Sequence, residues 1–178
     1  MTDMARKFDI DSLLLRFRDL AGRESSFRPL DTLLPRFARK RYSVIGRPGE
    51  ETVAGTALDK IEAFNATYLH CPSGNGIGAH AHDTTEVFVA MSGRWSVTLG
   101  EDGDEVAVLE PWDIIAVPPG EMHGAVNISD DDAWLMTINA GNQGAEIHWA
   151  PELVEEARRA GLTAESSEVP ASTKGERR

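Results

Sequence analysis

The stretch GNGIGAHAHDTTEVFVAMSG, residues 74–93, carries the pattern that decides the fold and the site. His80 and His82 lie two residues apart, and Glu86 follows four residues after His82. In an extended strand, side chains two residues apart lie on one face, so both imidazoles point the same way; Glu86 shares their parity if residues 83–85 stay roughly extended. Two imidazoles and a carboxylate are costly to bury together without a cation between them. The pattern therefore predicts a metal site with open coordination positions.

A second stretch, PPGEMHGAVN at residues 118–127, places His123 shortly after a Pro-Pro-Gly turn. Written as spacings, the first stretch is Gly-x5-His-x-His-x3-Glu-x6-Gly and the second is Pro-x-Gly-x2-His-x3-Asn. A lone His-x-His pair is often only a surface feature. Two spaced patterns in this order are far more specific than either one alone.

Together the two patterns resemble the paired motifs of the cupin superfamily, with the short gap of its single-domain members. The first motif matches at every fixed position, whereas in the second Trp112 stands where the family usually has its opening glycine, so a different turn is expected before Ile114. The resemblance implies an all-β fold, the cupin-type double-stranded β-helix or jelly-roll barrel, with a metal inside one mouth. Carried over position by position, it implies the metal ligands His80, His82, Glu86 and His123. A ligand from a second hairpin would close such a cluster across the barrel.

The donor set restricts the metal without identifying it. Three imidazoles and one carboxylate suit a divalent transition metal (Fe, Mn, Ni, Co, Cu or Zn) better than Ca or Mg. Residue types do not separate these six metals. No catalytic residue is assigned, because the nearest candidate base, Glu121, is better explained as a surface turn residue.

Competing interpretations of the same region carry less weight. The glycines of residues 74–78 resemble a phosphate-binding loop, but no strand-loop-helix context follows. A His-x-His pair also opens several zinc hydrolase sites, whose further His and Asp ligands have no counterpart at the required spacings. His70 and His148 are interpreted as packed or rim residues and Cys71 as a small buried residue. We therefore expect none of these three to be a ligand.

Short β-branched segments separated by turn signals fill the middle of the chain. This pattern favours an all-β sandwich or barrel, and no helical period interrupts it. The expected strands are Tyr42–Ile45, Phe64–Cys71, Glu86–Met91, Trp95–Leu99, Glu105–Leu109, Ile114–Val117, Gly124–Ile128, Trp134–Ile138 and Glu146–Trp149.

The flanks differ in character from the barrel. The sequence predicts an N-terminal helical and extended arm (1–55), the barrel (56–150), a C-terminal helix (151–163) and a disordered tail (164–178). The arm is expected to contain a helix capped by Asp11 or Ser12, with Leu13, Leu14, Phe17 and Leu20 at helical spacing and Gly22 at its end, followed by a short helical turn over 30–37 that Pro35 limits.

Composition excludes several classes of protein. The 178 residues contain 18 Lys and Arg against 29 Asp and Glu, a net charge of −11, which disfavours nucleic acid and anionic membrane surfaces as partners. A single cysteine, Cys71, excludes an internal disulfide and cysteine-rich metal modules. The absence of a signal peptide or an apolar span predicts a cytoplasmic protein.

The expected partner is a small molecule. Phe88 and Ala90 share the metal-facing parity of Glu86, and Arg94 is the cation nearest to the motifs in sequence, which favours a mostly apolar or aromatic ligand. Both faces of the segment 134–138 are apolar, so we expect the arm, the C-terminal helix or a second copy to cover its outside. A homodimer is the corresponding hypothesis.

Three functions remain open at this stage. Cupins with three histidines and one glutamate often act as metal-dependent oxidoreductases of the dioxygenase type, so the resemblance implies this function first. The same metal could instead act as a Lewis acid in an isomerase or lyase. The barrel could also bind or sense a small molecule or metal without catalysis.

Overall fold

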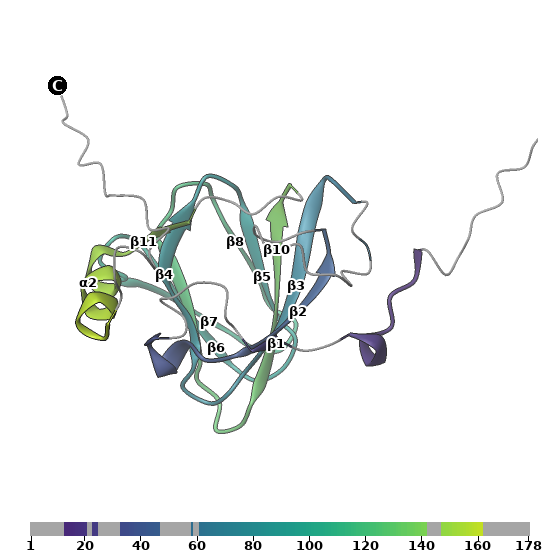
Figure 1. The fold of residues 1–178 in the computed structure, drawn as a ribbon, viewed down its shortest axis with the longest axis horizontal. Coiled ribbons are helices and arrows are strands. Elements are labelled where there is room, and N and C mark those ends of the chain that lie inside the picture. The colour runs from purple at the N-terminus through teal and green to yellow at the C-terminus, as the bar shows by residue number, and fades with distance from the viewer. Residues whose placement is uncertain are drawn as a thin grey trace, which may run out of the picture.

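Two antiparallel sheets face each other at the centre of the molecule (Figure 1). The computed structural model describes residues 13–20, 23–24, 33–46, 58, 61–141 and 147–161. One sheet has the strand order β1-β2-β3-β10-β5-β8 and the other the order β11-β4-β9-β6-β7. Their bounds are β1 (Arg23–Glu24), β2 (Lys40–Ile45), β3 (Phe64–Cys71), β4 (Gly76–His82), β5 (Glu86–Ala90), β6 (Trp95–Leu99), β7 (Glu105–Leu109), β8 (Ile114–Val117), β9 (His123–Asn127), β10 (Ala133–Ala140) and β11 (Ile147–Trp149). This two-sheet double-stranded β-helix confirms the predicted fold class.

Each predicted strand is present, and β4 forms around His80 and His82, outside the ranges predicted as strands. The glycine-rich residues 76–78 are its first three residues. Gly76 pairs with Val126 of β9, and a Cβ added to Gly76 would lie 1.9 Å from the carbonyl oxygen of Ala125. Glycine is therefore required here by the close approach of two backbones.

The inner faces of the two sheets form one hydrophobic core. Phe88 and Trp95 are fully buried, and Phe88 and Ala90 point inward, as the strand alternation predicts. The core cluster consists of Leu69, Cys71, Ile77, Phe88, Ala90, Trp95, Val97, Leu109, Val117, Ala125, Ala133 and Leu135. Both sheets contribute to it, so the core joins them.

The interior of the six-stranded sheet changes from apolar to polar along its strands. Residues that are register partners on adjacent strands place their side chains on the same face. Three rows cross β3, β10 and β5 in this way: Leu69–Leu135–Ala90, Thr67–Thr137–Phe88 and Asn65–Asn139–Glu86. Glu86 therefore lies at the polar end of the barrel interior.

The N-terminal arm does not form the predicted helix over residues 13–20. Over this range the structure has the 3-10 turn η2 (Phe17–Asp19), and Leu13 and Leu14 remain exposed. A helix this short needs tertiary packing of its apolar stripe to offset nucleation, and two exposed leucines contribute little to it. Phe17 does contact the barrel. Its ring lies 5.2 Å from that of Tyr42 and 5.3 Å from that of Trp134.

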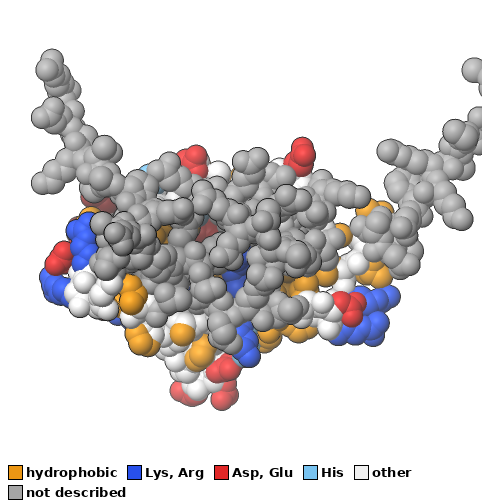
Figure 2. Space-filling model, in the orientation of Figure 1, with side chains coloured by type: hydrophobic (Ala, Val, Ile, Leu, Met, Phe, Trp, Pro, Cys, Tyr) orange, Lys and Arg blue, Asp and Glu red, His pale blue; other side chains and the backbone are white. Residues whose placement is uncertain are grey.

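Through Phe17, the N-terminal arm covers part of the outer face of β10. The arm was one of the three segments expected to cover this strand, together with the C-terminal helix and a second copy of the chain. The predicted caps Asp11 and Ser12, the end at Gly22 and the tail 164–178 lie outside the described residues. Hydrophobic side chains interspersed with charged ones remain visible on the described part of the surface (Figure 2). The homodimer stays a prediction.

The C-terminal helix α2 (Pro151–Arg159) begins at a proline, as predicted. It packs with the 3-10 turn η3 (Pro35–Phe37), which lies where the second helical turn of the arm was expected. Their small cluster consists of Leu33, Leu34, Phe37, Trp149, Leu153 and Ala157. A Cβ on Gly78 would meet Leu153 and Phe37 at 2.9 and 3.0 Å, so this cluster sits directly on β4. None of the helices in the described part of the chain is long and apolar enough to cross a membrane.

Candidate metal centre

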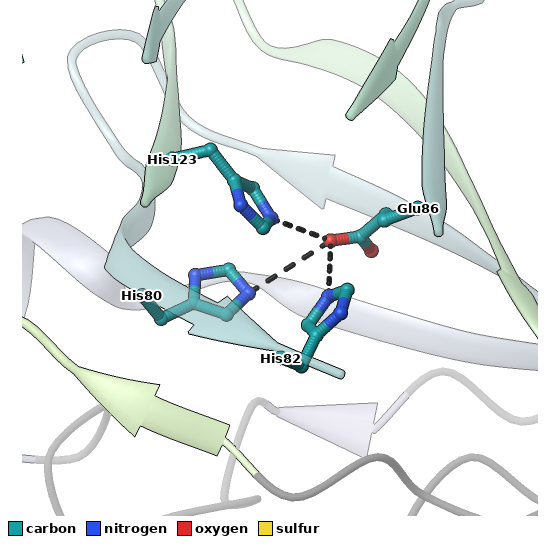
Figure 3. A group of neighbouring side chains, drawn as sticks. All are labelled: His80, His82, Glu86 and His123. Atoms are coloured by element: carbon teal, nitrogen blue, oxygen red, sulfur yellow. Dashed lines mark hydrogen bonds and ion pairs between the residues drawn. The ribbon is translucent and has the colours of Figure 1, made fainter. Parts of the chain in front are cut away.

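The structure brings the four predicted ligands together in the barrel interior (Figure 3). His80 and His82 come from β4, His123 from β9 and Glu86 from β5 of the facing sheet. His80 and His123 are register partners, which places their rings 4.4 Å apart. All four side chains are buried, and one donor atom of each lies within 4.8 Å of the others. Their coordination of a metal stays a prediction, which the geometry below supports.

Each histidine is oriented by a backbone carbonyl close to it in sequence. Nδ1 of His80 lies 2.8 Å from the carbonyl oxygen of Gly78, and Nδ1 of His82 lies 2.9 Å from that of Thr84. Nδ1 of His123 lies 2.8 Å from the carbonyl oxygen of Glu121. A carbonyl only accepts, so each Nδ1 must carry the proton and each Nε2 of a neutral ring presents its lone pair. Such bonds are the usual outer partners of metal-binding histidines.

The three Nε2 atoms converge on one oxygen of Glu86. Oε2 lies 3.0 Å from Nε2 of His82, 3.0 Å from Nε2 of His123 and 3.8 Å from Nε2 of His80. Lone pairs facing a carboxylate oxygen repel each other unless a proton or a metal ion lies between them. For metal–ligand bonds of about 2.1 Å, neighbouring ligands at right angles are about 3.0 Å apart, so the spacing suits a bound transition metal.

Without metal, burial and the mutual interactions of the cluster shift the pKa values of three of its side chains. Burial lowers the pKa of His80 to about 4, although Glu86 opposes this shift. Burial also disfavours the charged form of His82, but the hydrogen bond and charge of Glu86 outweigh it and raise the pKa of His82. Burial acts to raise the pKa of Glu86, and the hydrogen bonds from His123 and His82 lower it instead. At neutral pH His80 is thus neutral and Glu86 ionised, the forms that bind a metal.

We expect the metal-free protein to be most stable near pH 6.5, the ordinary pKa of histidine. Below that pH, unfolded His80 takes up a proton that folded His80 accepts only near pH 4, which removes up to about 3 kcal/mol of stability between the two values. Folded His82 holds its proton to higher pH than unfolded His82, so its contribution is present below pH 6.5 and is lost as the pH rises through the folded pKa.

Urea unfolding of the chelator-treated protein at several pH values measures this profile. The variant His80→Gln is the control. It has no imidazole at this position, so it should not show the part of the fall in free energy of unfolding between pH 6.5 and pH 4 that His80 causes. A free energy of unfolding that rises steadily from pH 6 to pH 9 would contradict the raised pKa of His82.

The side chains interpreted as non-ligands lie away from this cluster. His70 is on the outer face of β3, where its ring stacks 4.5 Å from that of Trp134 and its Nε2 is 3.6 Å from Asp132. His148 is exposed on β11, and Cys71 is fully buried in the core. Glu121 serves the site through its backbone carbonyl. These positions agree with the sequence interpretation.

Sequence reasoning missed Asn139, which contacts Glu86 directly. Its Nδ2 donates a hydrogen bond of 3.0 Å to Oε1 of Glu86, the oxygen that the histidines leave free. Asn139 lies beyond the predicted end of its strand, although it has the inward parity of Leu135 and Thr137. This parity is the signal in the sequence that could have placed Asn139 in the barrel interior.

The second motif departs from the family pattern in the type of residue at position 112. Trp112, at the position of the usual glycine, has φ = 76°, a left-handed conformation that favours glycine. The expectation of a turn different from that of the family stays a prediction. The hydrogen bonds from Trp112 N to Ala90 O and from Asp113 N to Glu110 O hold the turn in place.

Comparisons with known proteins agree with this geometry. Residues 68–149 match the family model of the cupin domain, a range that includes all four clustered side chains. No match was found among curated protein sequences. Residues 68–149 are thus a cupin domain, and the two-sheet fold is that of the solved double-stranded β-helix structures.

Solved structures show the same fold at low sequence identity. A conserved protein with a double-stranded β-helix domain from Klebsiella pneumoniae is 18% identical with a TM-score of 0.50, covering 82% of this chain and 97% of its own. A putative sugar phosphate isomerase from Acidithiobacillus ferrooxidans is 17% identical with a TM-score of 0.56, covering 74% and 77%. Oxalate decarboxylase from Lactobacillus farciminis is 12% identical with a TM-score of 0.56, covering 80% and 37%. At such identities the likeness concerns the fold alone.

Proposed function

We propose that this cupin is a metal-dependent oxidoreductase of the dioxygenase type that acts on a small, mostly apolar or aromatic organic molecule. The observation that carries the proposal is the convergence of three oriented Nε2 atoms and one carboxylate oxygen in a buried site. Four protein ligands leave positions free on a six-coordinate metal, where a substrate and dioxygen can bind. When bound, a redox-active metal would supply the electron transfer that these side chains cannot.

The surroundings of the cluster support a partly aromatic substrate. The ring of Phe88 lies 5.7 Å from that of His123, and the ring of Trp149 lies 5.5 Å from that of His80. Apolar walls of this kind exclude water and favour apolar ligands. On the polar side, the carbonyl oxygens of Asn65 and Asn139 are buried without a hydrogen-bond partner. Hydroxyl or N–H groups on a hydroxylated aromatic substrate could donate to these oxygens.

A non-catalytic metal-binding or sensing barrel is the second candidate, and one observation favours it. In the described part of the chain, the buried titratable side chains other than the four of the cluster are Arg39 and Cys71. Cys71 lies in the core, and Arg39 donates hydrogen bonds to the carbonyl oxygens of Phe37 and Gly76. Neither is placed as a general acid or base beside the cluster.

Elemental analysis followed by oxygen-uptake measurements tests the proposal. We expect a stoichiometric redox-active metal and oxygen consumption with at least one compound from a panel of catechols, flavonols, thiols and diketones. Removing the metal with a chelator should abolish the uptake, and adding the same metal back should restore it.

Two results would count against oxidoreductase activity. One is a protein that selects zinc over iron, manganese, nickel and copper. The other is a redox metal at full occupancy with no oxygen consumption across the panel, which would favour the binding barrel.

A further inference from the structure

Asn139 lies outside the four predicted ligands and donates a hydrogen bond to Glu86, a member of the candidate metal cluster. We propose that Asn139 is a positioning residue: its amide holds Oε1 of Glu86 away from the metal, so that the carboxylate binds through Oε2 alone. This inference rests on the metal site of the proposed function but not on the reaction. It assigns a separate task to each oxygen of Glu86.

The sheet register places Asn139 for this task. Asn139 is the register partner of Glu86 on one side and of Asn65 on the other, so the three side chains share the interior face of one row. The two oxygens of Glu86 have different partners: Oε2 faces the histidines, and Oε1 accepts the hydrogen bond from Asn139. The geometry of the pleated sheet alone thus brings an amide to the second oxygen.

Chemistry decides which way the Asn139 amide points. A carboxylate only accepts hydrogen bonds, so the nitrogen of the amide must face Glu86. The carbonyl oxygen of Asn139 is then buried without a partner, an arrangement that native structures rarely leave without a reason. The bond to Glu86 explains why the amide keeps this orientation.

The consequence for the metal concerns the number of free positions. An unrestrained carboxylate can bind a metal through one oxygen or two. Occupying Oε1 with an N–H donor disfavours the second contact, and one more coordination position stays open for an exogenous ligand. A residue of this kind affects metal affinity through the ligand that it orients.

The experiment compares Asn139→Ala and Asn139→Asp with a matched control, Asn65→Ala. Asn65 lies in the same row and is 2% exposed, but its amide donates to the carbonyl oxygen of Gly141 and not to Glu86. Aspartate has nearly the shape of asparagine, lacks its N–H donors and would repel the carboxylate. The probe is Co²⁺ alone, titrated in competition with a chelator, and its visible absorption spectrum reports coordination number.

We expect both Asn139 variants to bind Co²⁺ 10- to 100-fold more weakly than wild type, and Asn65→Ala to stay within about twofold. In Asn139→Ala the visible bands should weaken, because a second carboxylate contact raises the coordination number. Melting of the metal-free proteins controls for general damage, since Asn65→Ala and Asn139→Ala should lose comparable stability.

An unchanged Co²⁺ affinity and spectrum in a folded Asn139→Ala protein would overturn the proposal, and so would an equal affinity loss in Asn65→Ala. Wild-type protein that binds no Co²⁺, Mn²⁺ or Zn²⁺ would instead remove the metal site itself and both proposals with it. The two failures are therefore distinguishable.

Discussion

Glu86→Gln is expected to lower metal affinity by more than about 100-fold, because mutation of groups that only support a ligand typically costs 10- to 100-fold. Glutamine keeps the shape of the side chain but replaces the one anionic donor with a neutral amide. That carboxylate lies 3.0 Å from two of the three Nε2 atoms, so no other described side chain can replace it. Metal content after dialysis and a chelator competition titration measure the effect.

The barrel should remain folded in this variant. The core cluster is built from other rows of the two sheets, so circular dichroism should show an intact β-structure and only a modest loss of thermal stability. Removing the charge that raises the pKa of His82 should also flatten the alkaline side of the pH–stability profile. His82→Ala should lose metal as well. Stoichiometric metal retained in both variants would show that these residues are not ligands.

Gly76→Ala is expected to cost at least about 3 kcal/mol of stability, enough to unfold a marginal protein. The added Cβ would lie 1.9 Å from the carbonyl oxygen of Ala125 and 2.8 Å from Cα of Val126. Both are backbone atoms and cannot rotate away. The substitution therefore forces β4 and β9 apart at the pairing that aligns His80 with His123.

Gly124→Ala is the matched control, since Gly124 belongs to the same strand pair. Its Cβ would lie 3.1 Å from the carbonyl oxygen of Ile77, so a shift of a few tenths of an ångström suffices. We expect a loss of about 1 kcal/mol there and retained metal binding. Urea unfolding and metal content should rank the proteins as wild type, Gly124→Ala and Gly76→Ala. Equal stability of the two variants would contradict the close approach at Gly76.

The two motifs, through their resemblance to the cupin pattern, were sufficient to name the four side chains of the cluster. His80 and His82 share the parity of β4, which depends only on the extended backbone. Glu86 does not continue that strand as expected, because a bend at residues 83 and 84 separates β4 from β5 of the facing sheet. The second motif supplied His123 by resemblance. The same alternation placed Phe88 and Ala90 inside the barrel, and the structure confirms both.

Features that depend on contact with another segment of the chain could not be predicted from spacing within the sequence. The Leu13–Leu20 stripe has helical spacing, but the structure forms the 3-10 turn η2 there and leaves Leu13 and Leu14 exposed. Gly76 was noted only among the glycines of residues 74–78, and the structure shows that it admits the backbone of β9. Trp112 shows the same limit, because only the folded turn reveals that a tryptophan adopts the conformation of glycine.

The sequence by itself determined the all-β class, the inward parity of the strands and the donor types of the candidate metal centre, because these follow from residue type and from a period of two. Only the tertiary structure decided that the three Nε2 atoms converge on Oε2 of Glu86, and that Asn139 occupies Oε1. Those contacts arise from the register between strands far apart in the chain. Register is a property of the assembled sheets, and no single strand contains it.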